Sequence, residues 1–286
     1  MDKFEDLKFY DKKNLDGGLR KKGIFKTSTN DKPLISIITT VLNNEKYLRA
    51  CLDSIHQQEY SNFEHIVIDG ASVDDTLNII KNYDDKIDYW CSQKDKGIYD
   101  AFNLGMKLSS GEIICFVNSD DKFYSNKTLN YVCKEFKNKK NIDFIFGPVK
   151  KHWAVLYGYK PWKIHYSWGF YTSHSTGFFI RRNSAKKVGL YNLKYKYSSD
   201  YDYFYRMIVL KKLKGLGTKK ENIFGVFRRG GFSSKVKFLD HFKEEIRIRL
   251  DNKQNKLLVL IIIIYKSIKH IKKIIKHFKC KFSSQV

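Results

Sequence analysis

The sequence predicts an α/β protein with a mostly parallel sheet flanked by helices on both faces. Two observations support this fold class. Short apolar runs rich in β-branched residues alternate with segments of helical periodicity through four rounds, and acidic residues follow several of these runs. Such alternation is typical of βαβ units, whose strands lie parallel in one sheet. Ligands of these sheets bind outside the carboxyl ends of the strands, so the acids are expected near a functional site.

The first half of the chain contains the clearest elements. A predicted strand at residues 34–42 is followed by apolar residues at helical spacing over 48–55. A second strand, Phe63–Asp69, ends in an acid, and the segment Ser72-Val-Asp-Asp75 has the form of a capping box that opens a helix. Residues 87–91 form the third predicted strand.

Three more elements follow before the pattern changes. A helix carrying Ala101, Leu104 and Leu108 leads to a fourth strand at residues 112–117. Residues 126–139 are expected to be helical, and residues 143–147 to be a strand.

The second half is less regular. Residues 151–173 are crowded with aromatic side chains that show no clean period. A strand at 177–181, a helix at 200–212 and a strand at 222–228 are expected beyond them. The aromatic stretch is open to two interpretations, a packed core or a surface that stacks on sugar rings.

Composition restricts the class of partner. The 286 residues carry a net charge of +24, which indicates an anionic partner such as a membrane surface, a phosphorylated substrate or nucleic acid. Five cysteines without Cys-x-x-Cys spacing predict buried, reduced thiols. The opening residues are charged from the second position, so we expect no signal peptide and a protein on the cytoplasmic side.

The C-terminal segment is strongly basic. Residues 252–286 contain nine lysines and no acid. The apolar run 257–265 is shorter than the roughly 20 residues that span a bilayer. Beyond it, isoleucines at three- and four-residue spacing alternate with lysines, which predicts a basic amphipathic helix on an anionic membrane surface. A helix that packs on the domain or dimerises is the alternative. No nucleic-acid reader module accompanies the lysines, so no nucleic-acid partner is expected.

An acidic cluster, Asn118-Ser119-Asp120-Asp121, follows the fourth predicted strand. Asp120 is the best candidate for a metal ligand, because Mg²⁺ and Mn²⁺ bind through one or two carboxylates together with substrate phosphates. A solvated turn is the alternative, since Ser-Asp-Asp is an ordinary turn composition. Asp69 lies at a parallel strand end, where an acid can accept hydrogen bonds from a nucleoside; the two sites are expected to share one crevice.

Four segments in this order resemble family 2 glycosyltransferases: residues 33–42, 66–76, 95–105 and 116–121. The chain is most similar to the branch that builds bacterial capsule, colanic-acid-type and O-antigen polysaccharides, over about residues 20–235. The resemblance implies a GT-A (Rossmann-like) fold, a nucleotide-sugar donor such as a UDP-sugar, a divalent cation (Mn²⁺ or Mg²⁺) and inversion at the anomeric carbon.

The resemblance also assigns residues to the donor site. It implies that Thr39, Val41 and Asp69 hold the nucleoside and that the acidic motif binds metal and diphosphate. Asp95 and Lys96 line the same crevice in one interpretation and form a solvated charge run in another. The donor-binding set is Thr39, Val41, Asp69, Asp95, Lys96, Asn118, Ser119 and Asp120. One departure is visible, because Asn118 stands where the family has Asp; Asp120 is left to hold the metal largely alone, with weak help from Asn118.

An inverting transfer needs a general base that takes the proton of the acceptor hydroxyl. Asp200, in Ser198-Ser-Asp-Tyr-Asp202, matches the base position of the family's second acidic motif, although an N-cap has the same sequence signature. His174 matches a recurring histidine that shapes the acceptor pocket, or is structural. Arg228 and Arg229 either reach the diphosphate or form a solvated basic edge.

These inferences divide the chain into three parts. Residues 1–32 are expected to be an N-terminal arm. Residues 33–235 form the GT-A domain, with a donor half at about 33–121 and an acceptor half at about 122–235. Residues 236–286 are a helical basic tail, which is expected to be membrane-associated.

The expected activity is inverting, metal-dependent transfer to a saccharide or lipid-linked saccharide, at the cytoplasmic face of the membrane, in cell-surface polysaccharide biosynthesis. Two alternatives remain open. One is another nucleotide-sugar enzyme such as a nucleotidyltransferase, which usually has a glycine-rich loop where this chain has Asn43-Asn44-Glu45. The other is a catalytically inactive membrane-binding protein with a transferase-like scaffold.

Overall fold

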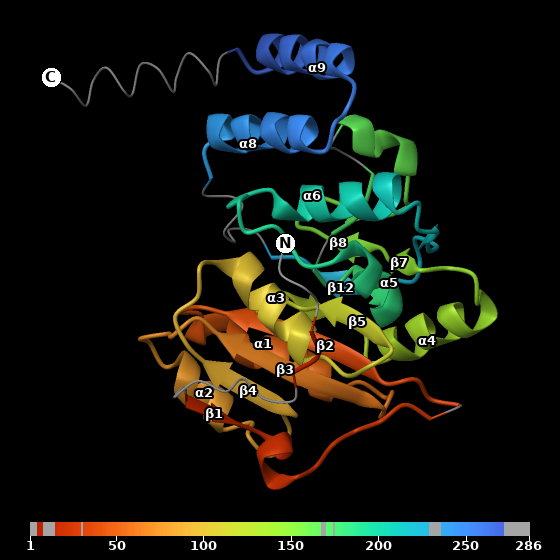
Figure 1. The fold of residues 1–286 in the computed structure, drawn as a ribbon. Coiled ribbons are helices and arrows are strands. Elements are labelled where there is room, and N and C mark those ends of the chain that lie inside the picture. Colours follow the sequence, from red (N-terminus) through yellow and green to blue (C-terminus); the bar gives the residue numbers. More distant parts are fainter. Residues whose placement is uncertain are drawn as a thin grey trace, which may run out of the picture.

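The computed structural model describes residues 5–7, 15–29, 31–166, 170–173, 175–228 and 236–271 (Figure 1). They form an α/β fold with a mainly parallel sheet and helices on both of its faces, which confirms the predicted fold class. The elements, in chain order, are β1 (Leu15–Gly17), η1 (Leu19–Lys22), β2 (Ile35–Val41), α1 (Glu45–His56), β3 (Phe63–Asp69), α2 (Thr76–Lys81), β4 (Tyr89–Ser92), α3 (Ile98–Leu108), β5 (Ile113–Phe116), β6 (Lys122–Phe123), α4 (Thr128–Asn138), β7 (Phe144–Phe146), β8 (Val149–Lys150), β9 (Val155–Leu156), η2 (Pro161–Tyr166), β10 (Phe178–Arg181), α5 (Arg182–Val188), α6 (Ser199–Tyr205), η3 (Arg206–Leu210), β11 (Gly215–Gly217), β12 (Gly225–Val226), α8 (Phe238–Asp251) and α9 (Lys256–Lys269).

The main sheet has the strand order β1-β4-β3-β2-β5-β10-β7-β11. The pairs β4–β3, β3–β2 and β2–β5 are parallel, whereas β10 runs antiparallel to both β5 and β7. Because β2, β3 and β5 point the same way, the residues that follow them emerge at one edge. A second, small sheet has the order β6-β12-β8-β9.

Side chains of β2 alternate between two apolar layers. Ile35 and Ile37 pack with residues of α1 and α4, while Ile38 packs with α3 on the opposite face. This two-residue period is what a strand with both faces covered requires. It also decides which residues at the end of β2 can reach a ligand.

Several local predictions need correction. The helix expected over 200–212 is α6 followed by a π-helical turn, η3, and the strand expected over 222–228 is reduced to β12. Ser72 does not cap α2, because its hydroxyl donates to Asp69 Oδ1 at 2.5 Å. The backbone N–H at the start of α2, that of Thr76, is instead bonded to Asp74 Oδ1 at 3.1 Å. The four described cysteines are buried and free, as expected.

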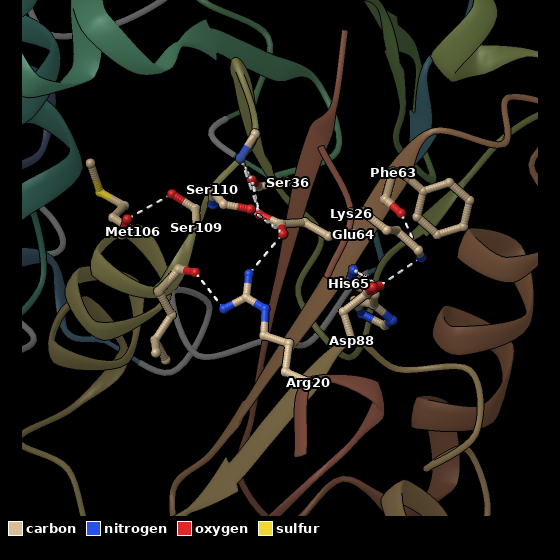
Figure 2. A network of polar contacts seen from close by, with 12 residues as sticks. Arg20, Lys26, Ser36, Phe63, Glu64, His65, Asp88, Met106, Ser109 and Ser110 are labelled. Atoms are coloured by element: carbon tan, nitrogen blue, oxygen red, sulfur yellow. Dashed lines mark hydrogen bonds and ion pairs between the residues drawn. The ribbon is translucent and has the colours of Figure 1, made fainter. Parts of the chain in front are cut away.

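Residues 15–29, predicted to belong to a separate arm, are built into the domain. β1 pairs antiparallel with β4 and forms an edge of the main sheet. Arg20, only 4% exposed, donates to Glu64 Oε2 at 2.7 Å, and Ser36 and Ser110 donate to the same carboxylate (Figure 2). The surrounding donors satisfy both carboxylate oxygens, so the buried charge is compensated.

A second polar contact holds the same segment. Lys26 Nζ lies 2.9 Å from Asp88 Oδ2, and this oxygen also accepts the backbone N–H of His65 at 2.8 Å (Figure 2). The ring of His65 contacts His56 Nε2 at 3.1 Å and Thr39 Oγ1 at 3.0 Å. Burial lowers the pKa of both histidines, in His56 to about 4.

The C-terminal helices lie at the opposite end of the molecule from β1. Figure 1 shows α9 stacked on α8, and α8 over α6. α8 contains acidic residues that bond to the domain: Asp251 accepts from Lys194 and from Tyr195, at 2.6 and 2.5 Å. The segment from residue 236 is therefore part of the folded domain through α8.

The predicted amphipathic positions beyond Ile271 lie outside the described residues. No helix in the described ranges is long and apolar enough to cross a bilayer.

Candidate active site

A cavity of about 1350 Å³ opens at the carboxyl edge of the parallel strands. This volume exceeds the roughly 300–1,000 Å³ of a pocket for one small ligand, so two ligands can be accommodated side by side. One end is lined by the ends of β2 and β5 and the loop before α3. The other end is lined by α6, α8 and α9.

The residues after β5 form a tight turn at the cavity edge. The backbone N–H of Asp121 donates to the carbonyl of Asn118 at 2.8 Å, and the hydroxyl of Ser119 accepts from the Asn44 side chain at 2.8 Å. Asn118, Ser119 and Asp120 all line the cavity. The side-chain oxygen of Asn118 accepts a 3.3 Å hydrogen bond from Thr40. The turn therefore directs the three predicted residues toward the ligand space.

Asp120 forms an ion pair with Arg228. Its Oδ2 atom lies 3.5 Å from Arg228 Nη2, and the Arg228 guanidinium stacks 3.8 Å from the centre of the Tyr47 ring. The Arg228 backbone N–H also donates to Asp121 Oδ1 at 3.2 Å. Arg228 thus lies beside the acidic turn, in the position needed to contact an anion held there. Its predicted companion Arg229 lies outside the described residues.

Asp121 differs from its neighbour in being buried. Its carboxylate is 3% exposed, and its Oδ2 atom has no hydrogen-bond partner among the described residues. Burial, with the charge of Asp120, raises the pKa of Asp121 to about 7. Lys151, which lines the cavity and has a pKa lowered by burial, provides partial compensation. Asp120 is therefore the carboxylate of this turn that is available to a ligand.

Two predicted nucleoside contacts do not line the cavity. Thr39 is fully buried on the face of β2 covered by α1, where it bonds to His65; its neighbour Thr40 lines the cavity instead. Val41, at the end of the strand, is a lining residue.

Asp69 is fully buried, and its carboxylate accepts from the hydroxyls of Ser72 and Ser92, both at 2.5 Å. It supports the loop beside the cavity in this structure.

The loop before α3 does line the cavity, through Asp95 and Lys96. Asp95 accepts the backbone N–H of Gly97 at 2.8 Å, which folds the loop over the start of the helix. Burial, with the charges of Asp100 and Asp69, raises the pKa of Asp95. The loop thus brings both predicted residues to the wall of the cavity.

Asp200 lies across the cavity in the first turn of α6. Tyr99 donates to its Oδ1 atom at 3.2 Å and Tyr171 donates to its Oδ2 atom at 3.1 Å. Burial and the charge of Asp200 hold the pKa of both tyrosines well above the usual value, so both hydroxyls remain protonated donors. The two tyrosines bond to different oxygens of this carboxylate and restrict its orientation.

The neighbouring acid has a different environment. Asp202 is 2% exposed and bonds to Arg206 Nε at 2.9 Å and to the Asn252 side chain at 2.9 Å. It lies inside the domain, as expected for a residue two positions along a helix from Asp200. His174 lies outside the described residues.

A contact from α8 supports the segment before α6. The carboxylate of Glu244 accepts the backbone N–H groups of Lys196, Tyr197 and Ser198, at 2.6, 2.7 and 2.7 Å. These donors precede the first turn of α6 and have no partner within that helix. Sequence reasoning missed Glu244, as well as Tyr99 and Tyr171. The Ser198–Asp202 motif was the sequence signal that predicted a functional role for the start of α6.

The protein ligands suit one cation that also binds substrate. No group of three or more His, Cys, Asp or Glu side chains in the described ranges could enclose a metal. Asp120, with a side chain 20% exposed, and the Asn118 amide offer one charged and one neutral oxygen. Mg²⁺ and Mn²⁺ are commonly held by one or two carboxylates plus substrate phosphates, so this pair fits the protein's share of such a site.

A match to a family model identifies the class. The model described as glycosyl transferase family 2 matches residues 36–208, which is most of the chain. This chain therefore belongs to glycosyl transferase family 2. The matched range ends at η3, so α8 and α9 lie beyond it.

Individual relatives agree with this class. A PGL/p-HBAD biosynthesis glycosyltransferase of Mycobacterium bovis (strain BCG / Pasteur 1173P2) is 29% identical over 184 residues, covering 60% of this chain and 68% of the relative. An uncharacterized glycosyltransferase of Rickettsia typhi, RT0329, is 30% identical over 188 residues, covering 62% and 59%. This chain thus spans a little more than half of the rickettsial relative.

Solved structures share the fold. S. aureus TarS 1-349 in complex with UDP-GlcNAc has a TM-score of 0.58 at 19% identity, covering 76% of this chain and 65% of that chain. The mannosyltransferase PcManGT from Pyrobaculum calidifontis, in complex with GDP-Man and Mn²⁺, has a TM-score of 0.59 at 13% identity, covering 81% and 67%. At these identities the likeness shows the GT-A fold alone.

Proposed function

We propose that this protein transfers a sugar, with inversion, from a nucleotide-diphosphate sugar to a saccharide or lipid-linked saccharide. The observation that carries the proposal is the placement of Asp120 and Asp200 on one cavity large enough for donor and acceptor. Both structural neighbours were solved with nucleotide sugars, UDP-GlcNAc and GDP-Man. A UDP-sugar is our proposed donor, and cell-surface polysaccharide, of the capsule or O-antigen type, our proposed product.

In the proposed reaction, the carboxylate of Asp200 takes the proton of the acceptor hydroxyl as its oxygen attacks the anomeric carbon. The bond from that carbon to the donor diphosphate breaks as the new glycosidic bond forms on the opposite side. Tyr99 and Tyr171 hold the Asp200 carboxylate at the angle that this transfer requires.

The departing diphosphate needs positive charge at the other end of the cavity. Asp120 would hold a divalent cation, with Asn118 as a weaker ligand, and the cation would neutralise the charge of the leaving group. Arg228 lies next to Asp120 and provides hydrogen-bond donors to the same phosphates. Lys96 and Lys151 line the cavity as further cations.

The remaining proposals concern location. The lysine-rich segment 252–286 favours peripheral attachment to an anionic membrane, which we place at the cytoplasmic face. The oligomeric state is left open.

The test is turnover of a panel of nucleotide sugars with Mn²⁺ or Mg²⁺. We expect Asp200→Asn to lower kcat by about 10²–10⁴-fold with little change in donor KM, because it removes a general base. Asp120→Ala is expected to raise the metal and donor concentrations needed for turnover. Asp31→Asn, a change at an exposed acid away from the cavity, is the matched control. Unchanged turnover in both cavity variants would refute the assignment.

A further inference from the structure

The outermost helix, α9, has an apolar face that no described residue covers. Six large apolar side chains lie on this face and a seventh, Ile271, follows two residues past the end of α9; each of the seven is between 49% and 69% exposed: Leu257, Leu260, Ile261, Ile264, Tyr265, Ile268 and Ile271. Their spacing of one, three or four residues places them on one side of a helix. A contiguous exposed apolar stripe of this kind marks an interaction surface. We call these seven residues the α9 stripe.

The opposite side of α9 faces the domain. Val259 and Ile262 are 2% and 4% exposed, and Lys266 forms a 2.6 Å ion pair with Glu245 of α8. Lys266, Glu245 and His241 also line the cavity at its acceptor end. One helix therefore separates the cavity wall from the α9 stripe, and its thickness is about 10–12 Å.

The charge around the α9 stripe restricts the occupant. Residues 252–271 contain no acid, and Lys253, Lys256 and Lys269 are exposed on this segment. A second copy of the chain, packed stripe to stripe, would bring like charges together, because a two-fold interface places each patch against itself. An anionic bilayer has the complementary charge, and it accepts aliphatic side chains without a shaped groove.

We propose that the α9 stripe lies in the surface of an anionic membrane and holds the acceptor end of the cavity beside it. The acceptor is then a lipid-linked saccharide whose reacting hydroxyl stands roughly one helix diameter from the bilayer. The acceptor part of this inference rests on the proposed transferase function. The membrane contact does not depend on that function. Membrane attachment bears on the class of acceptor because α9 alone lies between the cavity and the α9 stripe.

Membrane contact is tested by sedimentation with vesicles of phosphatidylcholine, with and without phosphatidylglycerol. The full chain should bind the anionic vesicles, and binding should weaken with salt, because exposed charges are screened. Failure to bind either vesicle would overturn the proposal. A concentration-dependent dimer that Ile261→Gln/Ile264→Gln/Ile268→Gln converts to a monomer would identify the α9 stripe as a subunit interface instead.

The same triple variant tests the α9 stripe directly. We expect it to lower vesicle partitioning at least about tenfold, since three aliphatic side chains lose their burial in the lipid. The control Ile261→Leu/Ile264→Leu/Ile268→Leu changes the same positions but keeps the apolar surface, and it should partition like the natural chain. If the Gln variant binds as well as this control, the α9 stripe is not the contact. If the Gln variant does not fold, neutral and anionic vesicles still test the natural chain.

Acceptor class is tested with membranes of the source organism and a labelled UDP-sugar panel. Label should enter product that is extracted into organic solvent. The rate of this transfer should be at least about tenfold lower in the Gln variant. Donor hydrolysis without membranes, and UDP binding, should remain unchanged in the variant. Label found only in water-soluble product would overturn the acceptor proposal. Normal vesicle binding without any sugar turnover would refute the proposed function and leave the membrane contact standing.

Discussion

The carboxylate of Glu244 accepts the backbone N–H of Ser198 at 2.7 Å, two residues before Asp200. The same carboxylate accepts the N–H groups of Lys196 and Tyr197. α8, which lies outside the range matched by the family model, thus fixes the start of the helix that carries the proposed general base. α8 therefore supports the proposed catalytic site.

Glu244→Ala is expected to lower kcat by roughly 10–100-fold while donor KM stays within a factor of about three. Its loss removes the acceptor of three backbone N–H groups, of which those of Tyr197 and Ser198 are partly buried, and lets the first turn of α6 shift. Steady-state kinetics on the preferred donor provide the measurement. Glu135→Ala removes a surface glutamate that pairs with Lys139, and it is the control. Equal kinetics in both variants would contradict the positioning role.

Tyr171→Phe removes a side-chain hydrogen-bond donor to Asp200. We expect kcat to fall about tenfold, because a hydrogen bond to a charged group contributes about 1.5–3 kcal/mol and orients the base. Tyr203→Phe is the matched control, since the buried hydroxyl of Tyr203 has no hydrogen-bond partner among the described residues. A loss of activity in the control as large as in Tyr171→Phe would mean that packing, and not the hydrogen bond, matters.

Arg20→Met is expected to lower the free energy of unfolding by about 3–5 kcal/mol, because it leaves the buried carboxylate of Glu64 without its cation. The double variant Arg20→Met/Glu64→Gln should lose less, since no unpaired charge remains. Urea denaturation followed by circular dichroism measures both. A double variant less stable than Arg20→Met would show that the uncompensated charge is not the cause.

Acid should destabilise the protein through His56. Burial, with Lys26 and Lys86 nearby, lowers its pKa from 6.5 to about 4 in the folded state. The folded state therefore favours neutral His56, and this contribution is complete above pH 6.5 and is lost as the pH falls through 4. Its size is on the order of 1–3 kcal/mol, because His56 is only partly buried.

Urea denaturation at pH 7 and near pH 4.5 measures this effect. His56→Gln should depend less on pH across the window than the natural chain. His152→Gln, a substitution at an exposed histidine, is expected to keep the full dependence. Identical pH dependence in both variants would assign the acid sensitivity to other groups.

Much of the fold follows from local pattern. Continuous apolar, β-branched runs and helical spacing predicted β2, β3, β4, β5 and α1 near their observed bounds, because both patterns depend on residues close in the chain. The weaker patterns of the second half predicted one helix over 200–212 without the π-helical turn η3, and they overestimated the length of β12. There, packing against distant elements outweighs local preference.

The sequence by itself determined which residues follow the end of β5, Asn118, Ser119 and Asp120, and it marked Asp200 through a later motif. Tertiary structure alone decided that Thr40 faces the cavity while Thr39 is buried, because adjacent strand residues point to opposite faces and the covering helix must be known. It alone joined Tyr171, Glu244 and Lys266 to the site. Contacts between residues so far apart in the chain are set by packing, and no local pattern in a single sequence records them.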